Sequence, residues 1–539
     1  MNNLVTPLLS DLYEFTMVYA YWKSGRHEDA SVFDLFIREN PFGGEFTIFA
    51  GLEEAVNYVK NFHLTEDDID YVKSVLPTAD TKYFTWLKHI DCSHIKIYAP
   101  KEGTIVFPMI PLLRVEGPLG IAQLLETTLL NLINYPSLVA TNAARMKLAV
   151  GLPAEVQNIF GTQAGKNKDL LEFGLRRAQG PNGGLTASRY SYLGGFDATS
   201  NMLAGKTYGI PVKGTLAHAF VSTFSSLKEL PSSVIITPDG KQTEFVSNVL
   251  DFRKKLSAGN SHEGELAAFI AYAQAFPKSF LALVDTYDTL KSGVPNFLAV
   301  ALALHAAGYP PVGIRLDSGD LAYLSKQTRE QFRKVSNQFR VPFENLSIVA
   351  SNNINEATLH ALTQQGHEID VFGIGTHLVT CEAQPALGGV YKLVEVNGAP
   401  RIKLSQEKAK TTIPGKKEVY RLIDQHGFPM TDLMIRVGEA PPKVGEKILC
   451  RHPFEEAKRA YIKPSDVKLL HQCMWDGKRA AEFPTLEQRR QFVLEQITSF
   501  RQDHLRYLNP TPYKVSVSES LYNFIHEIWR REMPVAELE

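Results

Sequence analysis

Between residues 155 and 385 the chain repeats one pattern: a short apolar run ends abruptly in polar or glycine residues, and a helical stretch follows. Buried parallel strands have continuous apolar runs of this kind rather than alternating ones. In a (β/α) barrel the catalytic groups lie just past the carboxyl ends of the strands. One polar ending alone could be an ordinary strand exit, but six together favour a barrel with a site at one mouth. The six segments are 169–184, 212–220, 279–289, 310–321, 346–356 and 369–378.

The region before the barrel has a mixed pattern of helices and strands. Residues 51–62 carry apolar side chains at helical spacing, directly after a strand-like run. Residues 96–119 form a β-rich stretch broken by proline and glycine. The segment 121–150 predicts one long helix and a second helix after Pro136. We therefore expect an N-terminal α/β domain.

Beyond residue 385 the chain becomes basic and extended. The stretch 388–430 predicts a β-hairpin, a lysine-bearing loop and a further strand, and helices are expected at 485–508 and 517–532. Nothing in this region indicates a catalytic group. The whole pattern predicts three parts: an N-terminal α/β domain at 1–150, a barrel at 151–385, and a C-terminal region with a basic hairpin or flap and helices at 386–539.

Composition narrows the class of protein. The 539 residues include 57 Lys and Arg against 58 Asp and Glu, a net charge of -1, which argues against nucleic acid as the main partner. Four cysteines without a CxxC pair indicate reduced thiols rather than a disulfide framework or a zinc site. The N-terminus does not resemble a signal peptide, and the apolar runs are too short to span a membrane. We expect a soluble cytoplasmic protein.

Two strand endings carry groups suited to anions. Arg315 and Asp317 alternate along one strand exit, so both can face the same mouth; an arginine binds a carboxylate or phosphate through two bonds, and the aspartate can hold a ribose hydroxyl or orient the arginine. The alternative is a structural Arg–Asp pair. Gly373, Gly375 and Thr376 follow another apolar run and offer N–H groups and a hydroxyl to a phosphate, although they form neither a Walker loop nor a GxGxxG fingerprint.

Three further features have both a functional and a structural interpretation. His218 stands where a strand would end, and a histidine in an apolar context is more often a core residue. Asp285 and Asp288 could face a Mg²⁺-bound diphosphate or cap a helix. A basic stretch after the barrel is either a solvated hairpin or a mobile flap over a polyphosphate. Its lysines are Lys392, Lys403, Lys408, Lys410, Lys416 and Lys417.

At this point the motifs converge on a family: the chain resembles nicotinate phosphoribosyltransferases, in order and through nearly its whole length. The resemblance implies a type II phosphoribosyltransferase fold, with an irregular α/β barrel beside an α/β domain built from the N-terminal region with C-terminal additions. The motifs that carry it are DLYEFTM (11–17), NPFGGEFTIFAGLEE (40–54), EFGLRRAQGPNGG (172–184), GGFDATSN (194–201), GTLAHAF (214–220), VDTYDT, GIRLDSGDL, FGIGT and PGKKEVYR (414–421).

The reaction that the resemblance implies joins nicotinate to 5-phosphoribosyl 1-diphosphate in NAD salvage. The products are nicotinate mononucleotide and diphosphate, and hydrolysis of ATP to ADP and phosphate drives the reaction through a phosphohistidine. The resemblance also implies Mg²⁺ or Mn²⁺, bound through the diphosphate, and a homodimer with shared active sites. Neither nucleic acid nor a membrane is an expected partner.

The roles of five residues follow from the matching motifs. His218 corresponds to the phosphorylated histidine, and Thr215 lies beside the nicotinate. Arg315 corresponds to the arginine that binds nicotinate. Thr376, with Gly375 alongside, corresponds to a residue that holds the phosphoribosyl diphosphate at its 5-phosphate.

Five more residues take roles from the same resemblance. Phe173 and Tyr13 correspond to the two aromatic residues on either side of the pyridine ring, with Tyr13 supplied by a partner subunit. Arg176 faces the phosphates. Asp285 and Asp317 face the ribose or the Mg²⁺-bound diphosphate, and Asp285 is the candidate carboxylate for the metal.

Substrate choice depends on Ser200 in this comparison. The related nicotinamide-using enzyme has an aspartate there, which accepts a hydrogen bond from an amide but repels a carboxylate. Ala219 departs from the family pattern, in which a serine commonly follows the histidine, and this puts the hydrogen bonding around His218 in doubt. The alternatives are a nicotinamide- or quinolinate-using phosphoribosyltransferase of the same fold, or a non-catalytic binding module that has kept the barrel.

Overall fold

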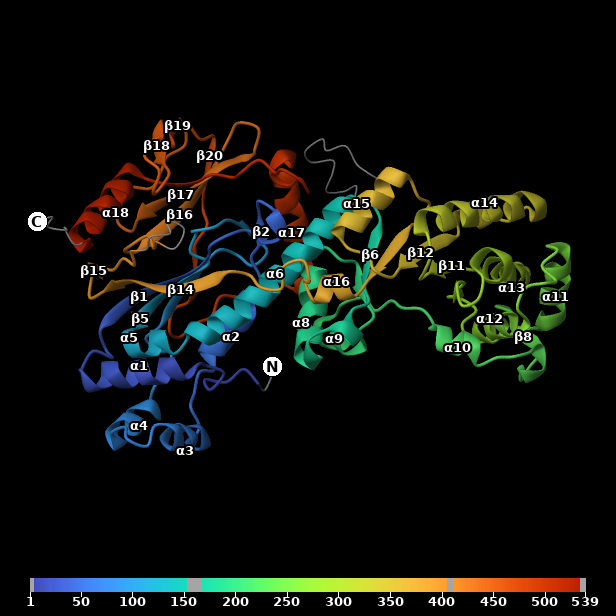
Figure 1. The fold of residues 1–539 in the computed structure, drawn as a ribbon, viewed down its shortest axis with the longest axis horizontal. Coiled ribbons are helices and arrows are strands. Elements are labelled where there is room, and N and C mark those ends of the chain that lie inside the picture. Colours follow the sequence, from blue (N-terminus) through green and yellow to red (C-terminus); the bar gives the residue numbers. More distant parts are fainter. Residues whose placement is uncertain (1–3, 153–166, 405–410, 534–539) are drawn as a thin grey trace, which may run out of the picture.

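The computed structural model describes residues 4–152, 167–404 and 411–533. At its centre lies a six-stranded parallel sheet, which Figure 1 shows to the right of the long helix α6. All neighbouring strands in this sheet run parallel. The strand order is β10 (Leu281–Leu283), β11 (Gly313–Leu316), β12 (Ser347–Ser351), β13 (Val371–Ile374), β6 (Asp169–Glu172) and β7 (Ala198–Thr199).

Five of the six predicted apolar runs are strands of this sheet, because their Val, Ile and Leu side chains are buried on both faces. The sixth prediction is wrong. Residues 212–220 contribute only a parallel bridge from Val212 to Thr199, and His218 begins the short helix α10 (His218–Ser222). Within the described ranges no strand ladder joins Val212 to β10, so the barrel is irregular and its wall is open there.

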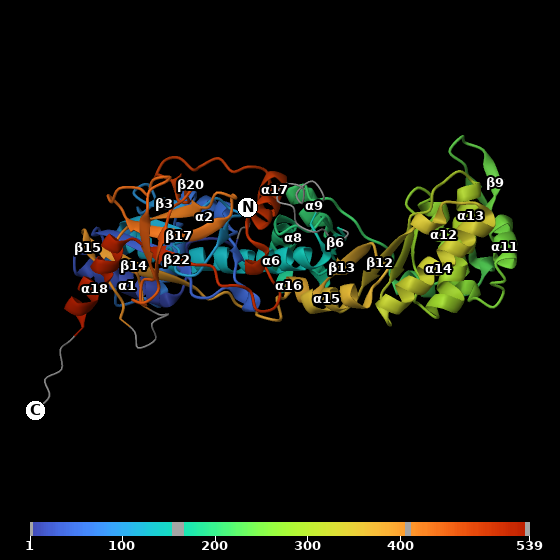
Figure 2. The same ribbon diagram turned by 90° about the horizontal axis from the view of Figure 1, so that it is seen from above.

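Helices between the strands complete the barrel, and α11, α12 and α13 form the end of the molecule opposite α1 and α18 (Figure 2). One buried cluster fills this part, with Phe297 and Phe332 among its largest side chains. The helices are α8 (Gly180–Leu193), α9 (Met202–Tyr208), α11 (Phe245–Lys255), α12 (Glu263–Ala275), α13 (Val294–Ala306), α14 (Leu321–Phe339), α15 (Glu356–Gln365) and α16 (Thr376–Val379), with the short turns η2 (Leu175–Arg177) and η4 (Thr289–Gly293); the hairpin of β8 (Val234–Ile236) and β9 (Gln242–Glu244) precedes α11.

The rest of the molecule contains two six-stranded sheets that share the other large core. The first joins both ends of the chain, since strands from the C-terminal third flank the N-terminal ones. Its order is β15 (Ala399–Pro400), β14 (Gly389–Val396), β1 (Ala30–Ile37), β5 (Leu113–Pro118), β3 (Lys96–Ala99) and β21 (Gln472–Trp475). The second consists of β19 (Arg459–Ile462), β18 (Ile448–Arg451), β22 (Val515–Val517), β17 (Pro429–Arg436), β16 (Lys417–Ile423) and β20 (Asp466–Leu469).

This arrangement confirms an α/β domain built from the N-terminal region with C-terminal additions. Because strands from beyond residue 385 lie in the N-terminal sheet, the boundaries at residues 150 and 385 stay predictions. The small ladder of β2 (Thr47–Ile48) and β4 (Ile105–Val106) lies beside it. The helices of the N-terminal and C-terminal regions are α1 (Leu12–Lys23), α2 (Leu52–Lys60), α3 (Glu66–Val75), α4 (Thr81–Leu87), α5 (Leu119–Gln123), α6 (Glu126–Val150), α17 (Leu486–Ser499) and α18 (Glu519–Glu532).

The predicted break at Pro136 is also wrong, because α6 continues through it. Proline removes the N–H that would bond the carbonyl of Leu132, and such a helix survives when packing holds it. Gly51 supplies that packing. A Cβ at Gly51 would lie 1.9 Å from the Leu132 oxygen, so the chain comes close to the helix there.

Two lysines of the basic stretch form ion pairs with strands of the N-terminal sheet. Lys417 is buried, and its Nζ lies 2.7 Å from Oδ2 of Asp34. Lys416 pairs with Glu116 at 3.0 Å. Lys417 therefore fits neither the solvated hairpin nor the mobile flap; Lys408 and Lys410 lie outside the described residues.

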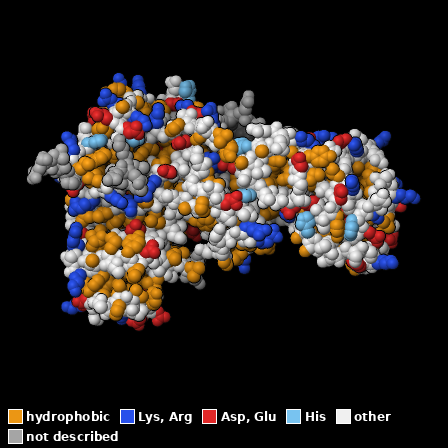
Figure 3. All heavy atoms as spheres, in the orientation of Figure 1, with side chains coloured by type: hydrophobic (Ala, Val, Ile, Leu, Met, Phe, Trp, Pro, Cys, Tyr) orange, Lys and Arg blue, Asp and Glu red, His pale blue; other side chains and the backbone are white. Residues whose placement is uncertain are grey.

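The surface shows where apolar side chains remain uncovered. In Figure 3 hydrophobic side chains gather at the lower left, over the region of α1, α3 and α4. Leu12, Tyr13 and Tyr71 are exposed hydrophobic residues of these helices. Searched over the described ranges, the structure has no helix with the length and apolar character of a membrane span.

Candidate active site

Arg315 is the centre of a polar cluster at the carboxyl end of the parallel sheet. It lies on β11, and its guanidinium donates three hydrogen bonds: Nε to Oγ of Ser351 at 2.8 Å, Nη1 to Oγ1 of Thr215 at 3.0 Å, and Nη2 to Oδ1 of Asp317 at 2.9 Å. Ser351 ends the neighbouring strand β12. The parallel pairing of β11 with β12 places Ser351 beside Arg315, and the segment before α10 brings in Thr215, which lies 100 residues from Arg315 in sequence.

His218 reaches the same cluster from the start of α10. Its Nδ1 lies 3.1 Å from the hydroxyl of Thr286, which follows Asp285. Its Nε2 lies 3.9 Å from Oδ1 of Asp285 and 3.7 Å from Oδ2 of Asp317. The side chain is 44% exposed, so a ligand can reach the ring. This is an open histidine among carboxylates and not a core residue.

The two aspartates differ in their surroundings. Asp285 is buried, and its Oδ2 accepts from the backbone N–H of Asp317 at 3.2 Å and from the hydroxyl of Ser318 at 2.5 Å. Its Oδ1 is buried without a hydrogen-bond partner among the described residues. Burial acts to raise the pKa of Asp317, but the Ser351 hydroxyl and the Arg315 guanidinium outweigh it and hold that pKa below its usual value. Asp317 is therefore ionised at neutral pH.

These carboxylates bear on the expected metal. Among the residues the structure describes, no group of three or more His, Cys, Asp and Glu side chains could hold a metal ion alone. Mg²⁺ that arrives with a diphosphate keeps several waters and needs only one or two carboxylates. The unpartnered Oδ1 of Asp285 fits such a requirement.

Phe173 closes one side of the cluster. It follows β6, and its ring centroid lies 5.4 Å from Cζ of Arg315. The ring fits because Gly373 has no side chain: a Cβ there would lie 2.4 Å from two ring carbons. The backbone N–H of Phe173 donates to the carbonyl of Ile374 at 2.8 Å, so β6 and β13 place the ring beside the FGIGT turn.

The remaining residues predicted at the mouth follow the adjacent strand ends. Thr376 is exposed at the start of α16, with Gly375 before it. Arg176 is exposed in η2, three residues after Phe173. Ser200 is exposed after β7, and its N–H donates to the carbonyl of Glu172 at 2.9 Å. All of them therefore lie on segments that leave the same end of the sheet.

Tyr13 is the exception. It lies on α1 in the N-terminal region, which Figure 1 shows apart from β11 and α10. Its side chain is 44% exposed. A single chain does not bring Tyr13 to Phe173 and Arg315.

Sequence reasoning missed several members of the cluster. Ser351, Thr286 and Ser318 bond to Arg315, His218 and Asp285, and each stands within two residues of a polar group that ends an apolar run. That position is the signal that could have identified them. Asn352 and Asn353 follow Ser351 with φ values of 85° and 49°, a left-handed pair that non-glycine residues seldom adopt and that is concentrated at functional sites.

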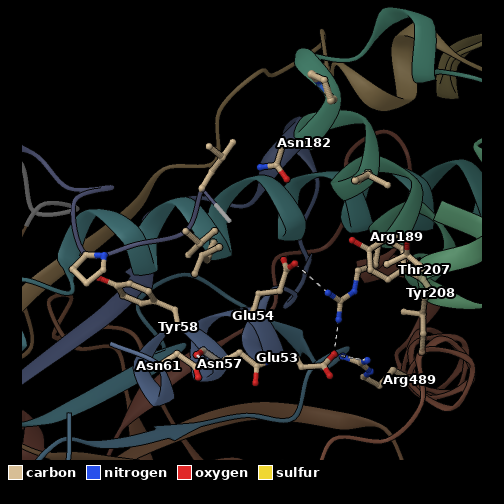
Figure 4. Close-up of a pocket in the computed structure, with 17 residues that line it drawn as sticks. Glu53, Glu54, Asn57, Tyr58, Asn61, Asn182, Arg189, Thr207, Tyr208 and Arg489 are labelled. Carbon is tan, nitrogen blue, oxygen red and sulfur yellow. Dashed lines mark hydrogen bonds and ion pairs between the residues drawn. The ribbon is translucent and has the colours of Figure 1, made fainter. Parts of the chain in front are cut away.

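A separate cavity of about 750 Å³ lies between α2, α8, α9 and α17. Figure 4 shows Glu53 and Glu54 of α2 turned toward Arg189 of α8, with Arg489 beside Glu53. Arg189 Nη1 lies 3.2 Å from Glu54, and Arg489 Nη2 lies 2.8 Å from Glu53. None of the predicted site residues lines this cavity, so its ion pairs join the three parts of the molecule rather than form the mouth of the barrel.

Comparison with known proteins identifies the family. Three family models match in order: the nicotinate phosphoribosyltransferase N-terminal domain over residues 8–134, the nicotinate phosphoribosyltransferase family over 169–430, and the corresponding C-terminal domain over 416–525. Nicotinate phosphoribosyltransferase 2 of Arabidopsis thaliana is 54% identical over 552 residues, which cover 100% of this chain and 97% of that protein. The chain belongs to the nicotinate phosphoribosyltransferase family.

Relatives within the family are similar in sequence and in structure. Nicotinate phosphoribosyltransferase of Homo sapiens is 44% identical, with 98% of this chain and 97% of that protein covered. The crystal structure of human nicotinic acid phosphoribosyltransferase superposes with a TM-score of 0.84 at 42% identity, over 96% of this chain and 99% of that chain. The central family model includes every strand end that contributes to the Arg315 cluster.

Proposed function

We propose that the protein joins nicotinate to 5-phosphoribosyl 1-diphosphate, giving nicotinate mononucleotide and diphosphate, with hydrolysis of ATP to ADP and phosphate. One observation carries the proposal: Arg315 is held by Ser351, Thr215 and Asp317 beneath the ring of Phe173 and beside His218. A fixed guanidinium next to an aromatic face suits a flat ring that bears a carboxylate. Membership of the family supports the same reaction.

In this proposal the pyridine ring lies against Phe173 and its carboxylate pairs with Arg315. Phosphoribosyl transfer passes through an oxocarbenium-like centre at ribose C1 as diphosphate departs, and the ring nitrogen attacks from the opposite face. Arg176 neutralises the phosphates, and Asp317 accepts from a ribose hydroxyl.

The turn after β13 takes the other end of the phosphoribosyl diphosphate. Thr376 is exposed at the start of α16, and its hydroxyl donates to the 5-phosphate, with the backbone of Gly375 alongside. Phe173 bonds to the strand that precedes this turn, so the ring of nicotinate and the 5-phosphate are held by neighbouring strand ends.

The ATP-dependent step is assigned to His218. Its Nε2 is the open nitrogen, since Nδ1 faces the Thr286 hydroxyl at 3.1 Å. The γ-phosphoryl group moves from ATP to this nitrogen and then to water, which gives ADP and phosphate. Mg²⁺ or Mn²⁺ bound with the diphosphate supplies positive charge to the leaving group, and Asp285 is the carboxylate that would hold it.

The histidine assignment is tested by labelling. Incubation with γ-labelled ATP is expected to give an acid-labile, base-stable phosphoprotein that His218→Ala lacks. Equal labelling of both proteins would contradict this role of His218.

The second aromatic residue comes from a partner subunit, so the active protein is a homodimer with shared sites. Tyr13 is exposed on α1 beside the exposed Leu12, apart from the barrel mouth of its own chain. In a two-fold dimer each α1 can face the partner's barrel.

Complementation tests the shared site. Inactive Tyr13→Ala and inactive Arg315→Ala are mixed, unfolded and refolded. About half of the dimers become mixed, and each has one site with both residues intact, so activity is expected to return to about one quarter of wild type. If each site belonged to one chain, no activity would return.

Product analysis tests the function itself. The purified protein is incubated with 5-phosphoribosyl 1-diphosphate and either nicotinate, nicotinamide or quinolinate, each with and without ATP. Nicotinate mononucleotide is expected from nicotinate, with a higher yield when ATP is present. Preferred use of nicotinamide or quinolinate would instead favour the alternative phosphoribosyltransferases of this fold, and no product from any base would favour a binding module.

A further inference from the structure

The segment that carries Asp285 and Thr286 is held from behind by a buried acid, Glu265. Glu265 stands in the first turn of α12 and is fully buried. Its Oε2 accepts from Oγ of Ser292 at 2.5 Å and from Nδ2 of Asn296 at 3.0 Å. Ser292 lies in η4 and Asn296 in α13, so one carboxylate oxygen fastens three elements together.

Further bonds make this a closed network. Ser292 Oγ accepts from the backbone N–H of His262 at 2.9 Å, and Asn296 Nδ2 also donates to the carbonyl of His262 at 3.0 Å. The hydroxyl of Ser261 donates to Oδ1 of Asn296 at 2.5 Å. Ser261, Glu265, Ser292 and Asn296 are all buried. Buried polar groups linked in this way fix one arrangement of the backbone, because each broken bond leaves a buried partner unsatisfied.

The network connects directly to the residues that face His218. A Cβ at Gly293 would lie 1.8 Å from the carbonyl oxygen of Val284, so the end of η4 packs against the residue before Asp285. The backbone N–H groups of Ser292 and Gly293 donate to the carbonyl of Asp288, both at 2.9 Å. A shift of η4 must therefore move the segment from Val284 to Asp288.

The choice of an acid here calls for an explanation. Within the described ranges Oε1 of Glu265 is buried without a hydrogen-bond partner. The charges that act most strongly on it are the negative ones of Asp285 and Asp288. Among the described residues, the groups that act on Glu265 are Ser292, Asn296 and the two aspartates, and no Lys or Arg is among them. Burying an acid without a counter-charge costs free energy, and hydrogen bonds such as those from Ser292 and Asn296 offset only part of that cost.

We propose that Glu265 is a positioning residue for phosphoribosyl transfer: through Ser292 and Asn296 it fixes η4, and thereby the orientation of Asp285 and Thr286 toward His218. The inference rests on the proposed function. Glu265 touches no substrate; it acts through the segment that it holds. Misplacement of a reacting geometry by about 1 Å through a remote substitution can lower the rate on the order of 100-fold.

Three variants separate positioning from a general loss of stability. Glu265→Ala removes the acceptor of both bonds, whereas Glu265→Gln keeps an oxygen that can accept them. Glu102→Ala is the control for the loss of a buried acid: Glu102 accepts from the N–H groups of Gly51 and Leu52 in the other large core and, unlike Glu265, also pairs with Arg489. The measurements are the melting temperature, kcat and the Michaelis constants for nicotinate, ATP and the phosphoribosyl diphosphate.

Glu265→Ala is expected to lower kcat/KM for the phosphoribosyl diphosphate by roughly 10- to 100-fold, with the Michaelis constant for nicotinate nearly unchanged because Arg315 is held by other groups. Glu265→Gln is expected to restore activity to within about 3-fold of wild type. Glu102→Ala is expected to lower the melting temperature. The kcat and the Michaelis constants of the enzyme that remains folded are expected to stay near wild type. If Glu265→Ala does not fold, Ser292→Ala removes the bond to Glu265 and the bond from the His262 N–H, and it is expected to lower kcat/KM for the phosphoribosyl diphosphate as well.

Distinct outcomes would overturn the two claims. A wild-type protein that makes no nicotinate mononucleotide rejects the proposed function, whatever the variants do. If the wild-type protein makes nicotinate mononucleotide and the kcat/KM of Glu265→Ala is within twofold of the wild-type value, only the positioning role is rejected. A loss in Glu265→Gln as large as in Glu265→Ala, or equal kinetic losses in Glu102→Ala, also rejects it.

Discussion

Two arginine–aspartate pairs in this protein have the same chemistry and different surroundings. Arg421 and Asp432 form a two-bond pair, both contacts 2.8 Å, between β16 and β17. The two side chains are 4% and 0% exposed, and Tyr513 donates to the same carboxylate at 3.1 Å. Arg315 and Asp317 are 14% and 27% exposed and lie beside the open ring of His218.

The difference shows what makes such a pair structural or functional. Arg421 packs against the rings of both Phe107 and Phe500, with its Cζ 5.7 and 5.0 Å from their centroids, and its hydrogen bonds end within the core. Arg315 bonds to two hydroxyls and one carboxylate that are near the mouth, so a ligand can approach the guanidinium. Residue types alone do not distinguish the two pairs. Access of a ligand to the guanidinium does.

The buried pair gives the largest expected effect. Arg421→Ala leaves Asp432 as a buried charge without its cation, and breaking such a pair typically costs about 3–5 kcal/mol. We expect the free energy of unfolding to fall by that order in chemical denaturation, while the fraction that remains folded keeps its kcat. The control is the double variant Arg421→Met with Asp432→Leu, because replacing both partners leaves no uncompensated charge in the core. Equal destabilisation by the single and double variants would contradict the role of the lone charge.

Glu265 extends the comparison to a buried acid that has no cation paired with it among the described residues. Burial, with smaller contributions from Asp285 and Asp288, raises its pKa to about 7 from 4.5. The folded state therefore holds this proton more tightly than the unfolded state, so the stabilisation is complete below pH 4.5 and is lost as the pH rises toward 7. Glu265→Gln cannot ionise. Relative to wild type, its free energy of unfolding is expected to rise by up to about 3 kcal/mol between about pH 4.5 and 8.

Denaturant unfolding of both proteins at several pH values checks this. The quantity to compare is the free energy of unfolding of Glu265→Gln minus that of wild type. Its change with pH reports the titration, whereas its value at a single pH also contains the effect of the substitution on packing. A difference that is constant across this pH range would mean that Glu265 does not titrate differently on folding.

Arg315→Ala is the counterpart of the Arg421 variant at the open pair. The loss of a charge-assisted contact to the nicotinate carboxylate is worth about 1.5–3 kcal/mol, or roughly 10- to 100-fold in kcat/KM for nicotinate. The melting temperature is expected to fall less than in Arg421→Ala, because Asp317 keeps its bond from Ser351 and is 27% exposed, whereas Asp432 is fully buried. Steady-state kinetics and thermal unfolding of the same preparation separate the two effects. An unchanged kcat/KM for nicotinate would reject the assignment.

The same contrast explains how much of the molecule could be predicted from the sequence. Five strands of the barrel were predictable because a strand buried on both faces needs a continuous apolar run, and their polar endings identified Arg315 and Asp285. Phe173 was predicted only through the resemblance to the family. The run at 212–220 misled, since its apolar residues pack in a loop and in α10. His218 still reaches the site, where its ring faces Thr286, Asp285 and Asp317.

Other features depended on contacts that no local pattern records. Thr286 and Ser351 cannot be told from ordinary polar residues until the folded chain brings them to His218 and Arg315. At Pro136 the helix α6 is packed closely by Gly51, which lies far earlier in the chain. Lys417 looked like part of an exposed basic stretch because its partner Asp34 is remote in sequence.

The smallest expected effect concerns Ser200, which tests charge at the exposed edge of the site. Its N–H is fixed to the carbonyl of Glu172, so a longer side chain there extends from a defined position beside Phe173. Ser200→Asp places a negative charge near the carboxylate of bound nicotinate, and repulsion at an exposed position is worth about 1 kcal/mol. We expect kcat/KM for nicotinate to fall by roughly 5-fold while that for nicotinamide holds or rises.

Ser200→Asn is the control, because its side chain has nearly the shape of aspartate without the charge. It is expected to leave the ratio of kcat/KM for nicotinate to kcat/KM for nicotinamide near wild type. Because added salt screens exposed charges, the Asp variant should recover part of its nicotinate activity at about 1 M ionic strength. If the Asp and Asn variants change the ratio equally, shape rather than charge at residue 200 determines the choice between acid and amide.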